Sequence, residues 1–402
     1  MRYRYGVTRL PGRVIFGAGQ RAALGRVAAS LGRRALICTD SRLGQLPVVG
    51  ELVDNLAAHG VTARVFDGTE AELPLEGIRD CVSRYRDFDA DVFVGLGGGS
   101  CMDLAKVVSL LMTHPEPASQ YYGEFKVPGP IKPVIAMPTT SGTGSEVTPV
   151  AVLADPERAV KVGISSPELI PTVAICDPEL TLSCPKGLTA ITGVDALSHA
   201  IESISAIRRE PDPEMVMERV FVGKNTLSDH YALHAIRLIT ENLARAVEDG
   251  SDLDARSAMM LGSTYAGMSF STGGTCAAHA IQYPVGALTH TPHGLGIGVL
   301  LPYTMDFNLP ASVEVYADVA NAMGISAEHG AEDAARKMIS AIRTLLERID
   351  IPRSLKDLGV KSDDLDAIAE QAALAIRLVD NNPRKLDVPA IRSILDASME
   401  GA

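Results

Sequence analysis

At 402 residues, the chain is longer than a single hydrophobic core usually serves, so two domains are expected. Its composition, with 46% hydrophobic and 21% charged residues, is that of an ordinary globular protein and argues against long disordered stretches. The net charge of −12 argues against nucleic acid and anionic membranes as partners, because both favour basic protein surfaces.

Neither the N-terminus nor the cysteines suggest export. The first residues, MRYRYGVTRLPGRVIFGAG, lack an apolar core of signal-peptide length, and no window approaches a membrane span. The six cysteines are scattered without a CxxC pair, so we interpret them as reduced and mostly structural. Cytoplasmic residence is the simplest prediction.

The N-terminal part of the chain alternates short apolar runs with helical patterns. Runs rich in β-branched residues at 35–40, 91–95 and 133–137 are predicted to be strands. Because these runs are apolar on both faces, they favour a parallel sheet that is covered by helices. We therefore predict an α/β domain over residues 1–185.

Helical periodicity dominates from residue 186 onwards, and no convincing strand pattern follows it. The clearest predicted helices span residues 229–243, 255–270, 332–349 and 363–379. A helical second domain over residues 186–402 is therefore predicted.

A glycine-rich turn follows the second of the predicted strands. Gly97, Gly98 and Gly99 lie where that strand leads directly into a helical pattern. Glycines allow a close approach of an anion, and the N–H groups of a helix N-terminus attract it, so phosphate binding is one interpretation. Ser100 and Asp103 also have the spacing of a capping box, which would explain both without a ligand.

Two further polar turns follow predicted strands. The segment Met137–Thr148, MPTTSGTGSEVT, offers hydroxyl groups that could bond phosphate, ribose or a carboxamide, although a plain Ser/Thr-rich turn has the same composition. Asp40 could accept hydrogen bonds from an adenosine ribose and repel a 2′-phosphate, which favours NAD over NADP. A strand-end turn aspartate explains Asp40 equally well. The spacing does not match the GxGxxG fingerprint.

A candidate metal site combines one helix with a histidine-rich segment. Asp195 and His199 are four residues apart in a helical pattern, which places both on one face. Three of the nine histidines, His279, His290 and His293, lie close together further along the chain. We set His290 aside because it lies between two threonines in a predicted loop. The remaining four residues suit Fe2+, Zn2+, Co2+ or Ni2+ without choosing among them.

Two residues near these ligands have alternative interpretations. Glu202 could support the metal site or could be an exposed helix carboxylate. Cys276 could line the site, but a small core residue is the favoured interpretation.

Six motifs together resemble the iron-containing (group III) alcohol dehydrogenases. They are GGGSCMDLAK, PTTSGTGSEV, ISSPELIPTVAICDPELT, TAITGVDALSHAIES, HTPHGLGIGVLLP and NNPRKL, in that family's order. The resemblance implies a dehydroquinate synthase-like architecture, in which a Rossmann-like NAD(P)-binding domain precedes a helical domain that holds metal and substrate. It also implies an active site in the cleft.

The resemblance also implies specific site residues. It assigns metal binding to Asp195, His199, His279 and His293. Cofactor contacts are implied for Asp40, Gly97, Gly98, Ser100, Asp103, Thr139, Thr140, Thr143, Ser145, Thr148 and Lys161. The implied cofactors are NAD, with NADP as the other option, and Fe2+, with Zn2+ or another divalent ion as the alternative.

The implied reaction is hydride transfer between nicotinamide C4 and a small alcohol or aldehyde, with the metal as Lewis acid. A homodimer or higher homo-oligomer is expected. One alternative is a hydroxyacid-oxoacid transhydrogenase that retains its NAD. A sugar-phosphate cyclase, which is a lyase using NAD and metal, is another alternative, for which Arg237, Arg245 and Arg256 are available basic residues.

Two features depart from the common pattern of this family. Many members have a histidine where this chain has Tyr283, and a tyrosine would orient the substrate rather than carry protons at neutral pH. The segment 205–226 is longer than usual, and its charged stretch RREPDPEMVME suggests an inserted loop. Both departures resemble the transhydrogenase branch, whereas the short segment ALTHTPHG does not.

Overall fold

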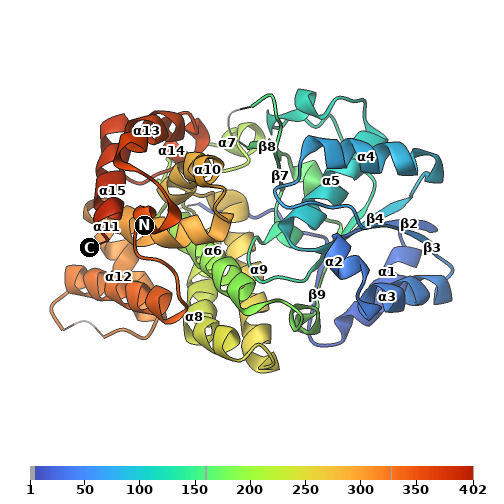
Figure 1. Ribbon diagram of the computed structural model, residues 1–402, viewed down its shortest axis with the longest axis horizontal. Helices are drawn as coiled ribbons and strands as arrows, with labels where there is room; N and C mark the ends of the chain where they lie inside the picture. The colour runs from blue at the N-terminus through green and yellow to red at the C-terminus, as the bar shows by residue number, and fades with distance from the viewer. Residues whose placement is uncertain (1–4, 159–160, 327, 402) are drawn as a thin grey trace. The chain divides into compact units, whose positions relative to one another are not determined.

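The computed structural model describes residues 5–158, 161–326 and 328–401. Within these residues the chain forms two compact units, an α/β unit and a helical unit (Figure 1). The α/β unit contains the described residues of Arg9–Ser183 and Met217–Val220, and the helical unit contains the other described residues.

This division differs from the expected domains in two short segments and at the domain boundary, where Cys184 and Pro185 belong to the helical unit. Residues 5–8 belong to the helical unit, where the backbone N–H of Thr226 donates to the Tyr5 carbonyl at 2.9 Å. Residues 217–220 belong to the α/β unit, where the Val220 N–H donates to the Glu124 carboxylate at 2.8 Å. Hydrogen bonds to residues distant in sequence therefore hold each of these segments in its unit. Local sequence patterns do not reveal such bonds, so the sequence did not predict this.

A six-stranded sheet with every pairing parallel forms the centre of the α/β unit, in the order β1-β9-β6-β4-β2-β3. Its strands are β1 (Arg13–Phe16), β2 (Arg34–Cys38), β3 (Thr62–Phe66), β4 (Val92–Gly97), β6 (Val134–Pro138) and β9 (Val173–Cys176). The three strands predicted from apolar runs are confirmed as β2, β4 and β6, as is the predicted parallel sheet.

Helices cover both faces of this sheet. Successive residues of a strand point to opposite faces, so Leu36 and Phe93 pack in one apolar cluster with α4 and α5, whereas Ile37 and Val94 pack in another with α1 and α3. The helices of the unit are α1 (Leu24–Ala29), α2 (Ser41–Gly44), α3 (Pro47–Ala58), α4 (Leu75–Tyr85) and α5 (Gly99–Thr113). Burial of both faces explains why these strands are continuous apolar runs.

A second, three-stranded sheet in the α/β unit was not predicted. It consists of β5 (Gly123–Glu124), β8 (Val162–Ser165) and β7 (Val150–Leu153), and β7 pairs with β8 in antiparallel fashion. These strands are two to four residues long, so they have too few residues for a clear alternation of apolar and polar positions.

The helical unit has no strand among its described residues, which agrees with the prediction. Its helices are α6 (Lys186–Ser205), α8 (Thr226–Glu248), α9 (Leu253–Gly273), α10 (Ala277–Thr289), α11 (His293–Ala322), α12 (Ala331–Arg348), α13 (Leu365–Ala373), α14 (Ile376–Val379) and α15 (Val388–Glu400). Helix α6 packs against α8, α9 and α11 and lies within one large apolar cluster. No helix in the described ranges is both long and apolar enough to span a membrane.

One predicted helix in this unit is wrong. The stretch 363–379 was predicted as one helix, but Leu374 and Ala375 separate α13 from α14. Helix α10, which carries His279, contains Pro284 in its interior. An internal proline costs roughly 3 kcal/mol, and burial of the helix face that contains Ile281 and Val285 offsets that cost. The predicted insertion also contains one helical turn, α7 (Met215–Glu218).

Candidate functional site

The four proposed metal ligands come from three helices of the helical unit. Helix α6 carries Asp195 and His199 one turn apart, α10 carries His279, and His293 is the first residue of α11. Asp195, His199 and His279 are buried, whereas the side chain of His293 is 27% exposed. A partly open group of ligands is what a substrate-binding metal centre requires.

The ring nitrogens of the three histidines all lie near one carboxylate oxygen. Oδ1 of Asp195 lies 3.7 Å from Nε2 of His199, 3.6 Å from Nε2 of His279 and 3.7 Å from Nε2 of His293. The ring centroids of His199 and His279 are 4.9 Å apart, and those of His279 and His293 are 5.3 Å apart. Such separations suit groups that share one ion at about 2.0–2.2 Å.

Buried polar atoms support the same interpretation. In the part of the chain that the structure describes, Oδ1 of Asp195 and Nε2 of His279 are buried and have no hydrogen-bond partner. Leaving such atoms without a partner costs about 1–3 kcal/mol each, so this point favours a further polar or charged group. A divalent cation would satisfy both atoms, and these side chains therefore fit a metal ion.

Glu202 is a buried neighbour of this group, so its interpretation as an exposed helix carboxylate is wrong. Its Oε2 lies 2.6 Å from Nδ1 of His279 and accepts the Cys276 N–H at 2.9 Å, while its Oε1 accepts the Ala278 N–H at 2.6 Å. With Nδ1 as the donor to Glu202, the lone pair of Nε2 is directed to Asp195. The sequence signal was the spacing of Glu202 from His199.

The two carboxylates make this point favourable for positive charge. Burial alone would lower the pKa of His279, but the charge of Glu202, the hydrogen bond to Glu202 and the nearby Asp195 carboxylate raise it to about 9. Burial alone would raise the pKa of Asp195, but His199, His279 and His293 hold it well below its usual range. A proton and a metal ion therefore compete for the same position.

The ring of Phe270 covers His199, and sequence reasoning missed it. Its centroid lies 4.2 Å from that of His199 with nearly parallel planes, at 23°. Phe270 lies near the end of α9, so no local spacing connects it with α6. Cys276 is a buried residue whose Sγ lies 3.3 Å from the Asn381 carbonyl, in agreement with the favoured interpretation of a core residue.

Tyr283 lies next to the proposed ligands. It follows His279 by one turn of α10, and its ring centroid is 6.1 Å from that of His293. Burial raises the pKa of Tyr283 above its usual value, so its hydroxyl stays protonated at neutral pH and can donate a hydrogen bond.

The glycine-rich turn and the second polar turn meet in the α/β unit. Strands β4 and β6 are neighbours, so their following turns lie at the same edge of the sheet. A Cβ on Gly99 would lie 2.7 Å from the Thr143 side chain, and one on Gly98 would lie 3.6 Å from the Thr140 hydroxyl. Gly97 has a φ of 150°, which only glycine adopts readily. This arrangement brings glycine backbone and threonine side chains together.

The capping box that the spacing of Ser100 and Asp103 suggested is not formed. Gly98 is the N-cap of α5, and no side chain caps the helix. Asp103 is instead buried, where it accepts the Ser145 hydroxyl at 2.6 Å and the Val152 N–H at 2.9 Å. The buried contacts between distant segments therefore outweigh local capping for Asp103.

Lys106 is a fully buried residue that the sequence-based selection missed. Its ammonium group donates to the Ser145 hydroxyl at 2.8 Å, to the Thr148 carbonyl at 3.1 Å and to the Val150 carbonyl at 2.7 Å. It lies 3.6 Å from Asp103. Asp103 and Lys106 thus fix the turn that carries Ser145 and Thr148. The sequence signal that could have identified Lys106 is a lysine within the otherwise apolar pattern of α5.

The remaining predicted cofactor residues have diverse surroundings. Asp40 is the N-cap of α2, where its Oδ1 accepts the Leu43 N–H at 2.8 Å. Thr139 is buried, and its N–H donates to the Gly97 carbonyl at 2.9 Å, whereas Ser100 is partly exposed. Lys161 forms an ion pair with Glu72. The structure therefore connects Thr139 with the glycine-rich turn and Lys161 with a carboxylate elsewhere in the unit.

Three arginines were considered as candidates for binding a phosphate. Two of them instead form hydrogen bonds or an ion pair with residues of the helical unit. Arg256 is buried and donates to the Gly250 carbonyl at 3.0 Å, the Thr189 hydroxyl at 2.7 Å and the Cys184 carbonyl at 3.1 Å. Arg245 pairs with Asp252 at 2.7 Å. These bonds give both arginines structural roles, which weakens the case for a sugar-phosphate cyclase.

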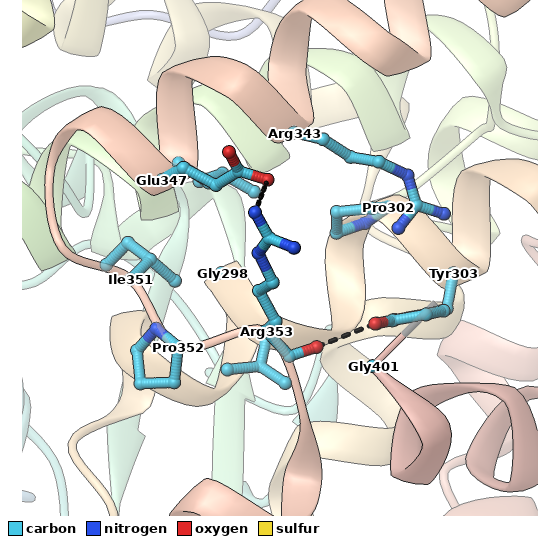
Figure 2. Close-up of a pocket in the computed structure, with 11 residues that line it drawn as sticks. Gly298, Pro302, Tyr303, Arg343, Glu347, Ile351, Pro352, Arg353 and Gly401 are labelled. Carbon is cyan, nitrogen blue, oxygen red and sulfur yellow. Dashed lines mark hydrogen bonds and ion pairs between the residues drawn. The ribbon is translucent and has the colours of Figure 1, made fainter.

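A pocket of about 250 Å³ lies elsewhere in the helical unit (Figure 2). Its lining includes Tyr303 and Arg353 but none of the proposed metal ligands. Figure 2 shows Arg353 directed to Glu347, at 2.8 Å, while the Tyr303 hydroxyl donates to the Arg353 carbonyl at 2.6 Å. Arg343, also in the lining, pairs with Asp306. The positive charge of each of these two arginines is therefore paired with a carboxylate.

Comparison with known families gives matches over most of the chain. Residues 11–178 match the family described as "Iron-containing alcohol dehydrogenase". Residues 189–399 match "Fe-containing alcohol dehydrogenase family, C-terminal".

Individual relatives agree with these matches. A sulfoacetaldehyde reductase of Bilophila wadsworthia is 35% identical over 96% of this chain and 97% of its own length. The mitochondrial hydroxyacid-oxoacid transhydrogenase of Rattus norvegicus is 32% identical over 96% of this chain and 88% of its own length. The crystal structure of sulfoacetaldehyde reductase from Bifidobacterium kashiwanohense in complex with NAD+ is 27% identical, has a TM-score of 0.84 and covers 99% of both chains.

Proposed function

Because the chain belongs to the iron-containing alcohol dehydrogenase family and is thus an oxidoreductase, we propose that it interconverts small aldehydes and alcohols with NAD and a bound divalent metal ion. The observation that carries this proposal is the convergence of three histidine Nε2 atoms on the buried Oδ1 of Asp195, which has no hydrogen-bond partner among the described residues. Fe2+ is the proposed ion, with Zn2+ as the alternative.

The two parts of the chain have different proposed tasks. Residues 1–185 bind the nucleotide, and residues 186–402 hold the metal and the substrate. The glycine-rich turn, with Thr140 and Thr143 facing it, supports phosphate binding, because glycine backbone and hydroxyl groups both suit an anion. The relative from Bifidobacterium kashiwanohense that was solved with NAD+ supports NAD as the cofactor.

In the proposed mechanism, Asp195, His199, His279 and His293 would hold the ion. When bound, the ion would supply Lewis-acid stabilisation of negative charge on the substrate oxygen, and NAD would supply the hydride donor or acceptor for the carbonyl carbon. Glu202 keeps the proton of His279 on Nδ1, and this leaves Nε2 available as a ligand atom.

Tyr283 and Phe270 shape the surroundings of these ligands. Tyr283 keeps its proton at neutral pH, so it orients the substrate by donating a hydrogen bond and does not shuttle protons. Phe270 stacks on His199 and thereby limits its ring rotation and its access to water. Fixed ligand geometry lowers the reorganisation needed during the reaction.

We also propose that the protein acts as a cytoplasmic homodimer or higher homo-oligomer, as is common for soluble enzymes. Light scattering of the purified protein tests the assembly, and a monomeric mass at micromolar concentration would contradict it.

The function is tested by NADH oxidation after loading the protein with Fe2+ or Zn2+. A panel of short aldehydes, semialdehydes and oxoacids is supplied, and the substrate ranking is measured by steady-state kinetics. His199→Ala is expected to lose both bound metal and turnover, whereas His59→Ala, which changes an exposed histidine, retains both. Full activity of metal-free His199→Ala protein would refute the metal assignment.

A further inference from the structure

The turn that joins α9 to α10 lies beside the proposed metal ligands. Residues 274–276 form this turn, between the end of α9 and the start of α10. Phe270, whose ring stacks on that of His199, is in the last turn of α9, and His279 is in the first turn of α10. The path of the α9–α10 turn therefore sets the positions of two groups at the proposed site.

The side chain of Asn381 binds the carbonyl groups of this turn. Asn381 follows α14 and is buried, and its Nδ2 donates to the Gly273 carbonyl at 2.9 Å and to the Thr275 carbonyl at 3.2 Å. The last carbonyl groups of a helix have no partner within it, so the first of these bonds gives the end of α9 a donor. Gly274 permits this approach, because its φ is 75° and a Cβ there would lie 2.8 Å from Nδ2.

Glu202 binds the N–H groups at the other end of the same turn. Its carboxylate accepts the Cys276 N–H at 2.9 Å and the Ala278 N–H at 2.6 Å, and it also lies 2.6 Å from Nδ1 of His279. An amide donor thus serves the carbonyl end of α9 and a carboxylate serves the N–H end of α10, as the two helix dipoles favour. Glu202 can meet all three groups only while the turn keeps this path.

The backbone of Asn381 connects the turn with the predicted insertion. The Asn381 carbonyl accepts the Ile207 N–H at 2.8 Å and lies 3.3 Å from Sγ of Cys276. The Lys224 N–H donates to the Ile207 carbonyl at 3.0 Å, so the two ends of the 205–226 segment meet at Ile207. The base of the insertion is therefore closed beside Asn381.

From these contacts we propose that Asn381 is a positioning residue of the proposed metal site. It holds the α9–α10 turn in the path that lets Glu202 bond the start of α10 and His279 together. This keeps Nε2 of His279 directed to Asp195. The base of the insertion bonds to the same residue and takes part in this positioning. The inference rests on the proposed function, because it concerns the metal site of that function.

The test compares two buried asparagines that are neighbours in the chain. Asn381→Ala removes the donor to the α9–α10 turn, and its affinity for Zn2+, measured by competition with a chelator, is expected to fall about 10-fold. Asn382→Ala is the matched control, because the Asn382 amide instead exchanges hydrogen bonds of 2.8 and 2.9 Å with Asn308 of α11. It should be less stable in urea and keep its affinity for Zn2+. Equal affinity in Asn381→Ala and the wild type would overturn the inference.

A double-mutant cycle tests whether Asn381 acts through Glu202. If it does, Asn381→Ala added to Glu202→Gln lowers the affinity less than about threefold, because the carboxylate that the turn serves is already gone. A merely structural role gives the same factor in both backgrounds, and that result would overturn the proposed route. If Asn381→Ala does not fold, Asn381→Ser, which keeps a hydroxyl donor, is measured in both backgrounds with the same expected pattern.

Bound Co2+ gives a second readout that does not depend on activity. Its visible spectrum follows the coordination geometry, so at saturating Co2+ it is expected to change in Asn381→Ala and not in Asn382→Ala. Identical spectra in both variants and the wild type would show that His279 keeps its place without Asn381.

The outcomes separate this inference from the proposed function. If the wild type binds Zn2+ and Co2+ and Asn381→Ala matches it in affinity and spectrum, the role of Asn381 is overturned while the metal site stands. If the wild type binds neither ion, the proposed function itself is overturned, because its metal site is then absent.

Discussion

Glu202 and His279 form a buried pair across α6 and α10, with Oε2 of Glu202 2.6 Å from Nδ1 of His279. The same carboxylate accepts two backbone N–H groups at the start of α10, from Cys276 and Ala278. One side chain therefore positions both the helix and the imidazole that the helix carries.

Glu202→Gln is expected to weaken metal binding roughly 10- to 100-fold, since an amide cannot hold the Nδ1 proton of His279 as a carboxylate does. The affinities for Zn2+ and Fe2+ are measured by competition with a chelator. Glu241→Gln, at an exposed position of α8, serves as the control and leaves the affinity unchanged. Unchanged affinity in Glu202→Gln would show that this contact does not position the ligand.

Gly294→Ala tests the close packing of α6 and α11 beside His293. A Cβ at this glycine would lie 2.2 Å from the Ile191 carbonyl oxygen, which is backbone and cannot move aside by itself. The helices must separate, so we expect a loss of about 1–3 kcal/mol of stability together with weaker metal binding. In Gly187→Ala, the added Cβ meets no atom within 4 Å, and thermal unfolding should show no loss. Equal behaviour of both variants would contradict the packing argument.

Lys106→Met tests the turn that carries Ser145 and Thr148. The variant removes the donor of three hydrogen bonds and leaves Asp103 buried without its cation, so a loss of about 2–4 kcal/mol is expected in urea unfolding. The affinity for NADH, measured by fluorescence, should fall about tenfold if this turn contacts the cofactor. Lys126→Met changes an exposed lysine and should have little effect on either. If the variant is as stable as the wild type but binds NADH weakly, Lys106 acts in cofactor binding and not in stabilising the turn.

The ionisation of Asp91 is expected to make the folding stability depend on pH. A hydrogen bond from the Arg34 guanidinium and backbone N–H groups lower the pKa of Asp91 to about 2, against about 3.9 in an unfolded chain. The resulting stabilisation is present above pH 4 and is lost as the pH falls from about 4 to about 2. Its size is about 1 kcal/mol, because the Asp91 side chain is 32% exposed and Arg34 is 42% exposed. The Tm difference between wild type and Asp91→Asn should therefore shrink between pH 6 and pH 3, and a constant difference would exclude this cause.

Local patterns in the sequence determined three strands of the six-stranded sheet and one half of the proposed metal site. Strands β2, β4 and β6 were predicted because a strand buried on both faces must be apolar throughout. Asp195 and His199 were paired because residues four apart share a helix face regardless of the rest of the fold. The clustering of histidines at 279–293 added His279 and His293, and the family resemblance agreed with that choice, although no local spacing connects them with α6.

Only the tertiary structure decided which polar side chains are buried together. Glu202 could have been an exposed carboxylate, and Asp103 could have capped α5, but packing placed each next to a partner from a distant segment. Lys106 gains its role in the same way, from the residues around the β6–β7 turn. Burial makes such partnerships obligatory, because a charge removed from water must find its partner within the fold, wherever that partner lies in the sequence.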